Sequence, residues 1–391
     1  MKKKISILGS TGSIGTNTLE VLDHKLYSFD INTFVANSNF KKIIHQIKKY
    51  KPNYFVIINK NTYLKVKKKF LKSKTIFFNK ISDLPLKGKI NFITISAIPG
   101  LAGLHPTMEF TKKSKEILLA NKEAVICGWD ILKKIAKKNK TKITPIDSEH
   151  FSIMKLLQGS KNIEIDKIYI TASGGPFLKL PLSKFNGIKP VEALRHPKWS
   201  MGKKISIDSS TLMNKILELI EAQKIFPFCK KKYEIIIHPQ SLVHAIVKFK
   251  NGITRLLYHE PDMKVPIANA IFKTNLDIKD LFFSKNDNLK NLEFVKIDPR
   301  RYPIIKIIPK LNKFISTPII LNAANEILVD HFLKRKISFN SISSSLFIVL
   351  NDKNYRKYAI KNPLNLKTIN IIDEWARETT LNIIKKNKKL R

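Results

Sequence analysis

The sequence predicts an α/β protein: a doubly wound parallel sheet comes first, an α+β part follows, and helices end the chain. Three observations support this prediction. Apolar strand patterns alternate with helical patterns over about the first 150 residues, which is typical of a parallel sheet covered by helices. Short β-like runs dominate the middle of the chain. From about Pro303 the spacing of apolar residues becomes helical.

In the first part, short apolar runs predict strands and amphipathic runs predict helices. The expected strands are Ile5–Leu8, Asp30–Ala36, Tyr54–Ile58, Phe92–Ala97, Ile117–Ala120 and Ile143–Ile146. The expected helices are residues 13–24, Lys41–Tyr50 and residues 151–158. Because the two patterns alternate, these strands are expected in one parallel sheet.

The remaining chain divides into a β-rich part and a helical part. The expected strands are Ile168–Thr171, Ile205–Ile207, Tyr233–Ile237, Ala245–Phe249 and Thr254–Tyr258. The expected helices are Leu321–Leu333, Ile342–Leu350 and Ile371–Lys385. Between Gly174 and Gly202 the chain is rich in Pro and Gly and lacks periodicity, which is typical of a lid loop or of a disordered segment. The predicted boundaries are residues 1–149, 150–276, 277–303 (a connecting segment) and 304–391.

The charge of the chain is strongly positive. Of 391 residues, 72 are Lys or Arg and 30 are Asp or Glu, a formal net charge of +42. Such an excess is compatible with nucleic-acid binding. However, the lysines are spread over nearly every segment, and no zinc-finger, RNA-recognition or basic-zipper pattern accompanies them. Solvated surfaces are the favoured interpretation, with a field that attracts anionic substrates and no nucleic-acid partner.

Cysteine content and hydropathy indicate the compartment. Neither Cys127 nor Cys229 belongs to a C-x-x-C pair, so no disulfide framework or thiolate zinc site is expected. No apolar run approaches the roughly 18 residues that a membrane helix needs. The sequence therefore predicts a cytoplasmic protein without a membrane partner.

A glycine-rich motif follows the first expected strand. Gly9-Ser10-Thr11-Gly12-Ser13-Ile14-Gly15 is a variant of the dinucleotide-binding fingerprint, with the first helix starting directly behind it. The second strand ends in Ala36-Asn37-Ser38-Asn39, without the carboxylate that would hold the ribose hydroxyls of NADH. Lys41 and Lys42 lie close by. This pattern favours NADPH; a plain glycine-rich turn is the alternative.

Two acids follow the strand Ile143–Ile146. In an extended chain, Asp147 and Glu149 would point to the same side and could bind one hard cation. The alternative is that they cap the helix 151–158, since acids are favoured at helix amino termini. Taken alone, this motif favours the cap.

A second polar group lies between Asp208 and Glu218. Ser209 is expected near a helix start, where phosphate binds readily. Asn214, Lys215 and Glu218 would share one helix face and present an amide, an ammonium and a carboxylate. The arrangement suits a phosphorylated ligand beside a metal. An ordinary Lys–Glu surface pair is the alternative.

The expected lid loop begins at Ser173-Gly174-Gly175-Pro176-Phe177 and ends with His196-Pro197-Lys198-Trp199-Ser200-Met201-Gly202. A small, flexible strand end suits a substrate contact and a hinge. Trp199 and Met201 could cover a bound ligand and exclude water. The alternative is that Trp199 packs onto its own domain.

Together these segments resemble the 1-deoxy-D-xylulose 5-phosphate reductoisomerase family. Further matching segments occur in the same order over essentially the whole chain. They are Ala120-Asn121-Lys122-Glu123, Pro145–His150, Ile205–Glu218, His238-Pro239-Gln240-Ser241, Glu260-Pro261-Asp262-Met263 and Leu321-Asn322-Ala323-Ala324-Asn325-Glu326. The resemblance implies a Rossmann-like NADPH-binding domain, a catalytic domain with a mobile lid, and a supporting helical domain in a homodimer.

The resemblance also implies a reaction. The family rearranges 1-deoxy-D-xylulose 5-phosphate, a small phosphorylated sugar, by a retro-aldol and aldol sequence. NADPH then reduces the product to 2-C-methyl-D-erythritol 4-phosphate, an early step of the non-mevalonate isoprenoid pathway. A divalent cation, Mg²⁺ or Mn²⁺ with Co²⁺ as a further option, polarises the carbonyl group.

Residue by residue, the resemblance implies metal ligation by Asp147, Glu149 and Glu218, with Lys122 as a further catalytic residue. The implied phosphate and hydroxyl contacts are Ser173, Ser209, Asn214 and Lys215. Ser148, Glu149 and Glu218 would contact the substrate near the metal, and His196, Trp199 and Met201 belong to the lid. The implied cofactor contacts are Thr11, Gly12, Ser13, Ile14, Asn37, Asn39, Asn121, Lys122, Glu123 and Gly202.

Two positions depart from the family pattern. The family commonly has Gly and a basic residue where this chain has Asn37 and Ser38. The missing basic residue weakens the argument for NADPH unless Lys41 or Lys42 substitutes. The family also has Gly where this chain has Ile216, and a local adjustment of packing is expected there.

Two other functions compete with this interpretation. A simple NADP-dependent dehydrogenase of the semialdehyde type needs a nucleophilic cysteine. Neither Cys127 nor Cys229 has a supporting motif. A nucleic-acid-binding protein would show salt-dependent binding and no affinity for NADPH.

Overall fold

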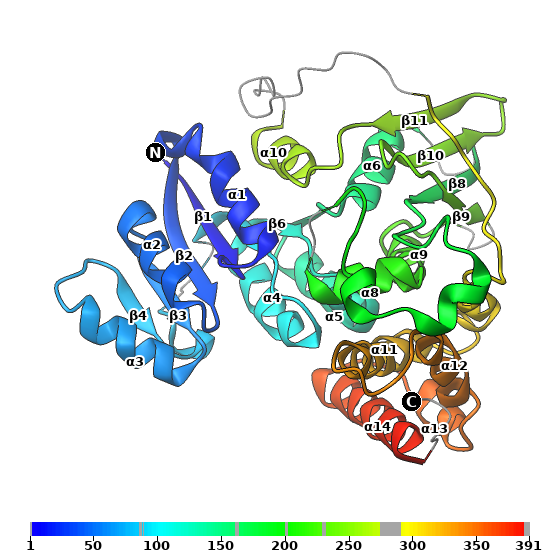
Figure 1. The fold of residues 1–391 in the computed structure, drawn as a ribbon. Helices are drawn as coiled ribbons and strands as arrows, with labels where there is room; N and C mark the ends of the chain where they lie inside the picture. The colour runs from blue at the N-terminus through cyan, green and yellow to red at the C-terminus, as the bar shows by residue number, and fades with distance from the viewer. Residues whose placement is uncertain are drawn as a thin grey trace. The chain divides into compact units, whose positions relative to one another are not determined.

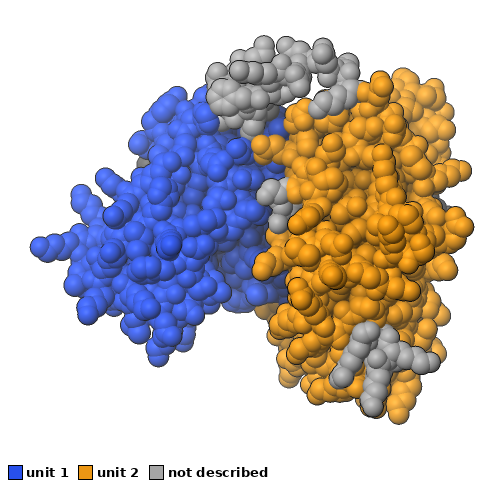
Figure 2. Space-filling view, viewed as in Figure 1, with its two compact units in different colours: residues 1–124, 130–151, 263–288 blue, residues 125–129, 152–262, 289–391 orange. Residues whose placement is uncertain are grey.

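The computed structural model describes residues 2–85, 88, 90–160, 164–199, 202–228, 232–273 and 291–386. These residues form two compact units (Figures 1 and 2). Unit 1 runs from the amino terminus to Ala124 and adds Asp130–Phe151 and a segment that begins at Met263. Unit 2 contains Val125–Trp129, Ser152–Asp262 and the carboxyl-terminal part of the chain. Within the described ranges, no helix is long and apolar enough to cross a membrane.

Unit 1 is built on a seven-stranded parallel sheet with the order β4-β3-β2-β1-β5-β6-β7. The strands are β1 (Lys3–Leu8), β2 (Phe29–Ala36), β3 (Tyr54–Ile57), β4 (Ile76–Phe78), β5 (Asn91–Ser96), β6 (Ser114–Leu119) and β7 (Lys142–Pro145). The strand order reverses beside β1, and ligands of open α/β sheets bind at such a switch point. The predicted doubly wound parallel sheet is confirmed.

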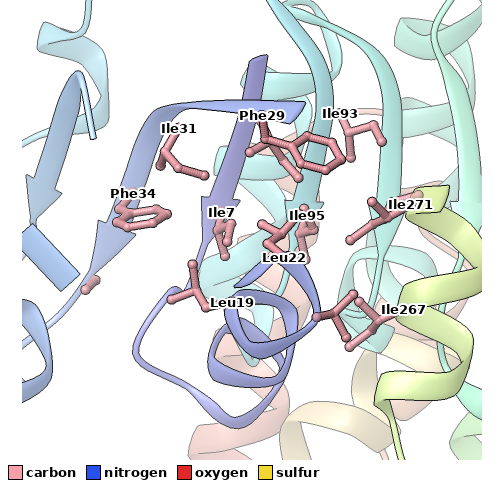
Figure 3. Close-up of a cluster of buried hydrophobic side chains, with 14 of the residues drawn as sticks. Ile7, Leu19, Leu22, Phe29, Ile31, Phe34, Ile93, Ile95, Ile267 and Ile271 are labelled. Carbon is pink, nitrogen blue, oxygen red and sulfur yellow. The ribbon is translucent and has the colours of Figure 1, made fainter. Parts of the chain in front are cut away.

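Helices connect these strands and cover the sheet. They are α1 (Ser13–Asp23), α2 (Phe40–Tyr50), α3 (Lys60–Lys69), α4 (Leu104–Thr111), α5 (Lys122–Lys138) and the later α10 (Lys264–Phe272). The helix after β7, α6 (Ser148–Leu156), begins in unit 1 and continues into unit 2. Figure 3 shows one face of the core, where Ile7 and Ile95 of the sheet meet Leu22 of α1 and Ile267 and Ile271 of α10. This layer fixes α1 and therefore the turn from which α1 starts.

Unit 2 contains a four-stranded mixed sheet with the order β11-β10-β8-β9. The strands are β8 (Ile165–Ala172), β9 (Tyr233–Ile237), β10 (Val243–Phe249) and β11 (Thr254–Tyr258). β10 is antiparallel to β8 and β11, whereas β8 and β9 are parallel. The helices are α7 (Pro190–Ala193), α8 (Lys203–Ser210), α9 (Met213–Ile225), α11 (Thr317–Leu333), α12 (Phe339–Leu350), α13 (Tyr355–Ala359) and α14 (Leu366–Lys386).

Short 3₁₀ helices complete the described chain. They are Leu26–Ser28, Ile81–Asp83, Leu101–Gly103, Leu182–Gly187 and Pro303–Lys310. One of them and α7 lie within the segment between Gly174 and Gly202, which is therefore less irregular than its composition suggests. The connecting segment expected at residues 277–303 lies partly outside the described residues.

The strand expected at Ile205–Ile207 is wrong, because these residues lie within α8. The short alternation of apolar and polar residues resembles a strand, but tertiary contacts select a helix. Ile207 is buried, and Ser206 and Ser210 satisfy their hydroxyl groups on the backbone of the helix itself.

Candidate functional site

The glycine turn of unit 1 has the backbone geometry of a dinucleotide site. Gly9 has a φ of 87°, and an added Cβ would lie 2.6 Å from the carbonyl oxygen of Ala97. A Cβ on Gly15 would collide with the carbonyl oxygen of Gly9 in the same turn. The first glycine thus permits the turn and the third permits close packing of α1, as in dinucleotide-binding proteins.

The centre of the turn is open to solvent. Gly12 is the N-cap of α1, it has no side-chain cap, and both Gly12 and Ser13 are exposed, whereas Thr11 and Ile14 are half-buried. The first turn of α1 contains no acid. The backbone N–H groups and the positive end of the helix dipole suit an anion such as a pyrophosphate.

A buried polar pair fixes the turn to α2. The Ser10 hydroxyl donates to Gln46 Oε1 at 2.8 Å, and Gln46 Nε2 donates to the Ser10 carbonyl oxygen at 2.8 Å. Beyond β2, Asn37, Ser38 and Asn39 are exposed, and Asn39 Oδ1 accepts from the Lys42 N–H at 3.1 Å. The end of β2 therefore offers amides and a hydroxyl, with no carboxylate.

Asn121, Lys122 and Glu123 follow β6 at the carboxyl edge of the same sheet. Asn121 is buried and caps α5: its Oδ1 accepts from the Ala124 N–H at 2.7 Å. Its Nδ2 donates to the carbonyl oxygens of Ile98 and Gly100 and to Glu123. Asn121 thus orders the loop after β5. This structural role accounts for the residue even without a direct contact to the cofactor.

The predicted acidic pair lies where β7 passes into α6. Asp147 receives a 3.0 Å ion pair from Lys122 and lies 3.2 Å from Nδ1 of the buried His150. Glu149 is only 7% exposed and accepts from the Ser148 hydroxyl. Carboxylate oxygens of Asp147 and Glu149 lie within 4.8 Å of each other. Two hard-oxygen donors at this distance, one half-buried and one buried, fit a divalent cation.

The extended backbone predicted for this pair is wrong. α6 begins at Ser148, and the Asp147 carbonyl oxygen accepts the helical hydrogen bond from the Phe151 N–H at 2.8 Å. The position of Asp147 is therefore that of a helix cap, while its carboxylate points to Lys122 and His150. His150 was missed by the sequence analysis. Its signal was the spacing of three from Asp147, which places both on one helix face.

In unit 2, α9 presents the three predicted side chains on one face. Glu218 is 1% exposed; it accepts from the Asn214 amide and, at 2.7 Å, from the Lys215 ammonium. Because Glu218 and Lys215 are both buried, they do not form the ordinary Lys–Glu surface pair that was the alternative interpretation. Ile216 is also fully buried, and α9 continues through this position without interruption. Ile216 thus packs within a regular helix, and the expected local adjustment stays a prediction.

Ser173 and His196 form a second polar pair in unit 2. His196 Nδ1 accepts from the Trp199 N–H at 2.9 Å, so Nε2 carries the hydrogen and donates to Ser173 Oγ at 2.9 Å. Burial lowers the pKa of His196 to about 4, and the positive charge of Lys215 adds to this effect. The neutral ring is therefore a fixed donor. Ser173 Oγ also accepts from the Gly175 N–H at 3.0 Å, which leaves the hydroxyl hydrogen for a ligand.

The Ser173 turn and Ser209 are in direct backbone contact. Gly175 has a φ of 65°, and an added Cβ would lie 2.9 Å from the Ser209 carbonyl oxygen. The buried Tyr302 donates to the Gly174 carbonyl oxygen at 2.6 Å, and burial raises the pKa of Tyr302 to about 12. The prediction that Ser209 lies near a helix start is wrong. It occupies the last turn of α8, before the residues that turn the chain into α9.

The lid residues are described in part. The Trp199 ring contacts the His244 ring edge-on, with centroids 5.9 Å apart, and His244 stacks on His259 at 3.8 Å. Gly202 is the exposed N-cap of α8. Ser200 and Met201 lie outside the described residues. Trp199 thus packs on its own unit, as the alternative interpretation expected.

Cysteine chemistry has little support here. Cys127 is 1% exposed on α5, so a thiolate there would be costly and inaccessible. Cys229 lies outside the described residues.

Unit 1 thus supplies an anion-binding glycine turn together with a half-buried and a buried carboxylate, and unit 2 supplies a cluster of hydroxyl, amide, imidazole and ammonium donors. Together they define a dinucleotide-binding α/β protein whose second unit is suited to an anionic ligand.

Comparison with known proteins identifies the family. Three family models match: 1-deoxy-D-xylulose 5-phosphate reductoisomerase over residues 5–128, its C-terminal domain over residues 143–226, and the DXP reductoisomerase C-terminal domain over residues 259–379. The chain belongs to the 1-deoxy-D-xylulose 5-phosphate reductoisomerase family.

Relatives match from end to end. The 1-deoxy-D-xylulose 5-phosphate reductoisomerase of Pelagibacter ubique is 44% identical, covering 96% of this chain and 97% of that protein. A crystal structure of DOX-P reductoisomerase with NADPH, fosmidomycin and magnesium is 31% identical, covers 98% of each chain and has a TM-score of 0.89. The Zymomonas mobilis enzyme with NADPH is 30% identical, covers 99% of this chain and 100% of that chain, and has a TM-score of 0.87.

Proposed function

We propose that the chain binds NADPH and one divalent cation and converts 1-deoxy-D-xylulose 5-phosphate to 2-C-methyl-D-erythritol 4-phosphate for isoprenoid synthesis. The observation that carries the proposal is the match to this family over nearly the whole chain. The solved relatives bind NADPH and magnesium, and the residues of both units fit these groups.

The phosphate group of the substrate binds to the donors of unit 2. Ser173 offers its hydroxyl hydrogen, and Lys215, a residue that is only 8% exposed, offers its ammonium. Ser209 and Asn214 complete the set, and Ser148 contacts the substrate near the cation. Charge-assisted hydrogen bonds from a buried ammonium suit a phosphate dianion. His196 stays neutral and orients Ser173. His196 and Trp199 belong to a lid that closes over the ligand when Trp199 leaves the contact with His244 that it makes in this structure.

The cation binds to Asp147, Glu149 and Glu218. All three are carboxylates, and their hard oxygens favour Mg²⁺ or Mn²⁺, with Co²⁺ as a further option. When bound, such an ion polarises the substrate carbonyl and stabilises an enediolate. Lys122 orients the Asp147 carboxylate through its 3.0 Å ion pair.

NADPH lies on the glycine turn of unit 1. Its pyrophosphate meets the N–H groups of Thr11, Gly12, Ser13 and Ile14, and its adenosine end lies beside Asn37 and Asn39. Asn121, Lys122, Glu123 and Gly202 lie on the nicotinamide side. In domain terms, residues 1–149 bind NADPH, residues 150–276 carry the substrate contacts, residues 277–303 connect, and residues 304–391 support the catalytic part.

The enzyme works as a cytoplasmic homodimer. An interface at a sheet edge is supported by β11, which is an outer strand of the unit 2 sheet. Leu256 within β11 is 44% exposed, and Ile253 directly before it is 53% exposed. On β9, the other outer strand, Ile237 already pairs with Val295. Sedimentation of the purified protein measures the assembly directly, and a monomer at micromolar concentration would contradict this part of the proposal.

The test of the reaction is NADPH oxidation, followed by absorbance, with 1-deoxy-D-xylulose 5-phosphate and Mn²⁺ in the presence and absence of a chelator. We expect oxidation that stops when the cation is removed and returns when it is restored. NADH in a parallel sample measures cofactor preference. A folded, metal-loaded sample that does not oxidise NADPH would contradict the proposed function.

A further inference from the structure

We propose that Lys42 recognises the 2′-phosphate of NADPH in this chain, although it lies on α2 and not at the end of β2. The inference rests on the proposed function, since it takes NADPH as the dinucleotide on the glycine turn. Position 38 lacks a basic side chain, because it is occupied by Ser38. The Lys42 ammonium donates to the Thr11 carbonyl oxygen at 3.2 Å and so lies at the glycine turn itself.

The direction of the Lys42 side chain follows from the way α2 is fixed. Gln46 faces Ser10 of the turn through two buried hydrogen bonds. Lys42 lies four residues before Gln46, so both side chains lie on the same face of α2, with Lys42 one turn nearer the end of β2. The Lys42 backbone N–H is held by the side chain of Asn39 at 3.1 Å. The ammonium is therefore directed to the space between the glycine turn and β2.

That space is where the adenosine ribose of a dinucleotide lies in this fold, with its 2′ position facing the end of the second strand. The first turn of α2 contains no acid, and no carboxylate follows β2 at residues 37–39. Among the residues that the structure describes, Lys42 donates to a neutral carbonyl oxygen and forms no ion pair. Its charge is thus available to a phosphate, and the positive end of the α2 dipole adds to the attraction.

Lys41 supplies a matched comparison. It is adjacent, equally charged and exposed, but one residue along a helix rotates the side chain by about 100° away from the face that Lys42 and Gln46 share. Replacing either lysine with glutamine changes the net charge by the same amount. A difference between the two variants therefore measures position and not the general field of a basic protein.

The experiment measures binding of 2′,5′-ADP and of 5′-AMP by calorimetry to the metal-free wild-type protein and to K42Q, K42R and K41Q, at constant ionic strength. For K42Q we expect about tenfold weaker binding of 2′,5′-ADP and unchanged binding of 5′-AMP, since only the first probe carries the 2′-phosphate. K42R should retain affinity within about threefold, because it keeps the charge. K41Q should change by less than about twofold.

Two outcomes overturn the proposal, and they differ in what else they overturn. If the wild-type protein prefers 2′,5′-ADP and K42Q keeps that preference, or K41Q loses it equally, Lys42 is not the recognition residue and the proposed function stands. If the wild-type protein does not distinguish 2′,5′-ADP from 5′-AMP, the proposed use of NADPH fails as well. Circular dichroism of each variant establishes that the fold is intact.

Discussion

At the scale of single residues, the substrate side of unit 2 depends on backbone shapes that only glycine adopts easily. Gly174 and Gly175 have φ values of 82° and 65°, and Gly175 also lies against the Ser209 backbone. The motif and its flexibility are evident from the sequence. The contact with Ser209 is not, because that contact joins residues from the end of a strand and the end of a helix.

Replacing Gly175 with alanine should strain the turn and press a Cβ on the Ser209 carbonyl oxygen. We expect a loss of about 2 kcal/mol in the free energy of unfolding and a higher KM for the substrate. Urea denaturation and steady-state kinetics measure the two effects. Gly159→Ala is the matched control, because Gly159 has a similar φ of 76° with nothing within 4 Å. Equal effects in both variants would show that the contact with Ser209 contributes nothing.

Glu218→Gln should abolish turnover and leave NADPH binding intact. The amide keeps the size of the side chain but removes a charge from the proposed cation site, so kcat should fall on the order of 100-fold or more. Fluorescence titration with NADPH measures binding, and absorbance measures turnover. Activity close to that of the wild-type enzyme would remove Glu218 from the set of metal ligands.

The low pKa of His196 gives the protein a predicted acid sensitivity. The ordinary pKa of 6.5 falls to about 4 in the folded chain because of burial and Lys215. The unfolded chain therefore binds the proton more readily, and the stabilisation present above about pH 6.5 is lost as the pH falls toward 4. Between about pH 7 and pH 4.5 the free energy of unfolding should fall on the order of 2 kcal/mol more in the wild-type protein than in His196→Gln. Urea denaturation at both values checks this, and parallel curves would contradict it.

At the scale of elements, the sequence predicted six of the seven strands of the parallel sheet and the long carboxyl-terminal helices, and it missed the short edge strand β4 (Ile76–Phe78). These elements carry long patterns of apolar residues, and their side chains are buried either along one side or completely. Examples are β2 (Phe29–Ala36) and α14 (Leu366–Lys386). Prediction from the sequence failed at α8, where eight residues carry too little periodicity to separate a helix from a strand. It also missed the partners that hold α8 in place, because these come from α11, which is more than 100 residues away.

The contact between α8 and α11 should position the phosphate-binding residues. Asn325 Nδ2 donates to Asp208 Oδ1 at 2.7 Å, and Asp208, next to Ser209, also pairs with Lys204 at 3.0 Å. Asn325 is fully buried, so Asn325→Ala leaves a buried carboxylate with one partner fewer. We expect a loss of about 1–3 kcal/mol in the free energy of unfolding. The substrate KM should rise while the affinity for NADPH stays constant.

Denaturation and kinetics of Asn325→Ala separate position from stability. The matched control is Asn322→Ala, which removes a buried amide from the same helix at a place where its Nδ2 bonds to Glu326 on α11 itself. If both variants raise the substrate KM equally, the Asp208 contact has no special effect on the phosphate site.

At the scale of the whole molecule, the net charge of +42 should accelerate capture of anionic ligands. Because the substrate and NADPH are both anions, kcat/KM should fall several-fold between about 20 and about 200 mM monovalent salt as the field is screened. Stopped-flow binding of NADPH should show the loss in the association rate. Association that is insensitive to salt would contradict this prediction.

The place of α10 bears on how the protein is made. Ile267 and Ile271 of α10 lie in the same apolar layer as Leu19 and Leu22 of α1, and Lys264 pairs with Glu20 at 2.8 Å (Figure 3). The two helices are about 250 residues apart in sequence, so the contact cannot form before α10 has been synthesised. Until the ribosome has synthesised α10, one side of α1 on the amino-terminal sheet stays uncovered. A nascent chain that pauses before α10 would thus present leucines that chaperones bind.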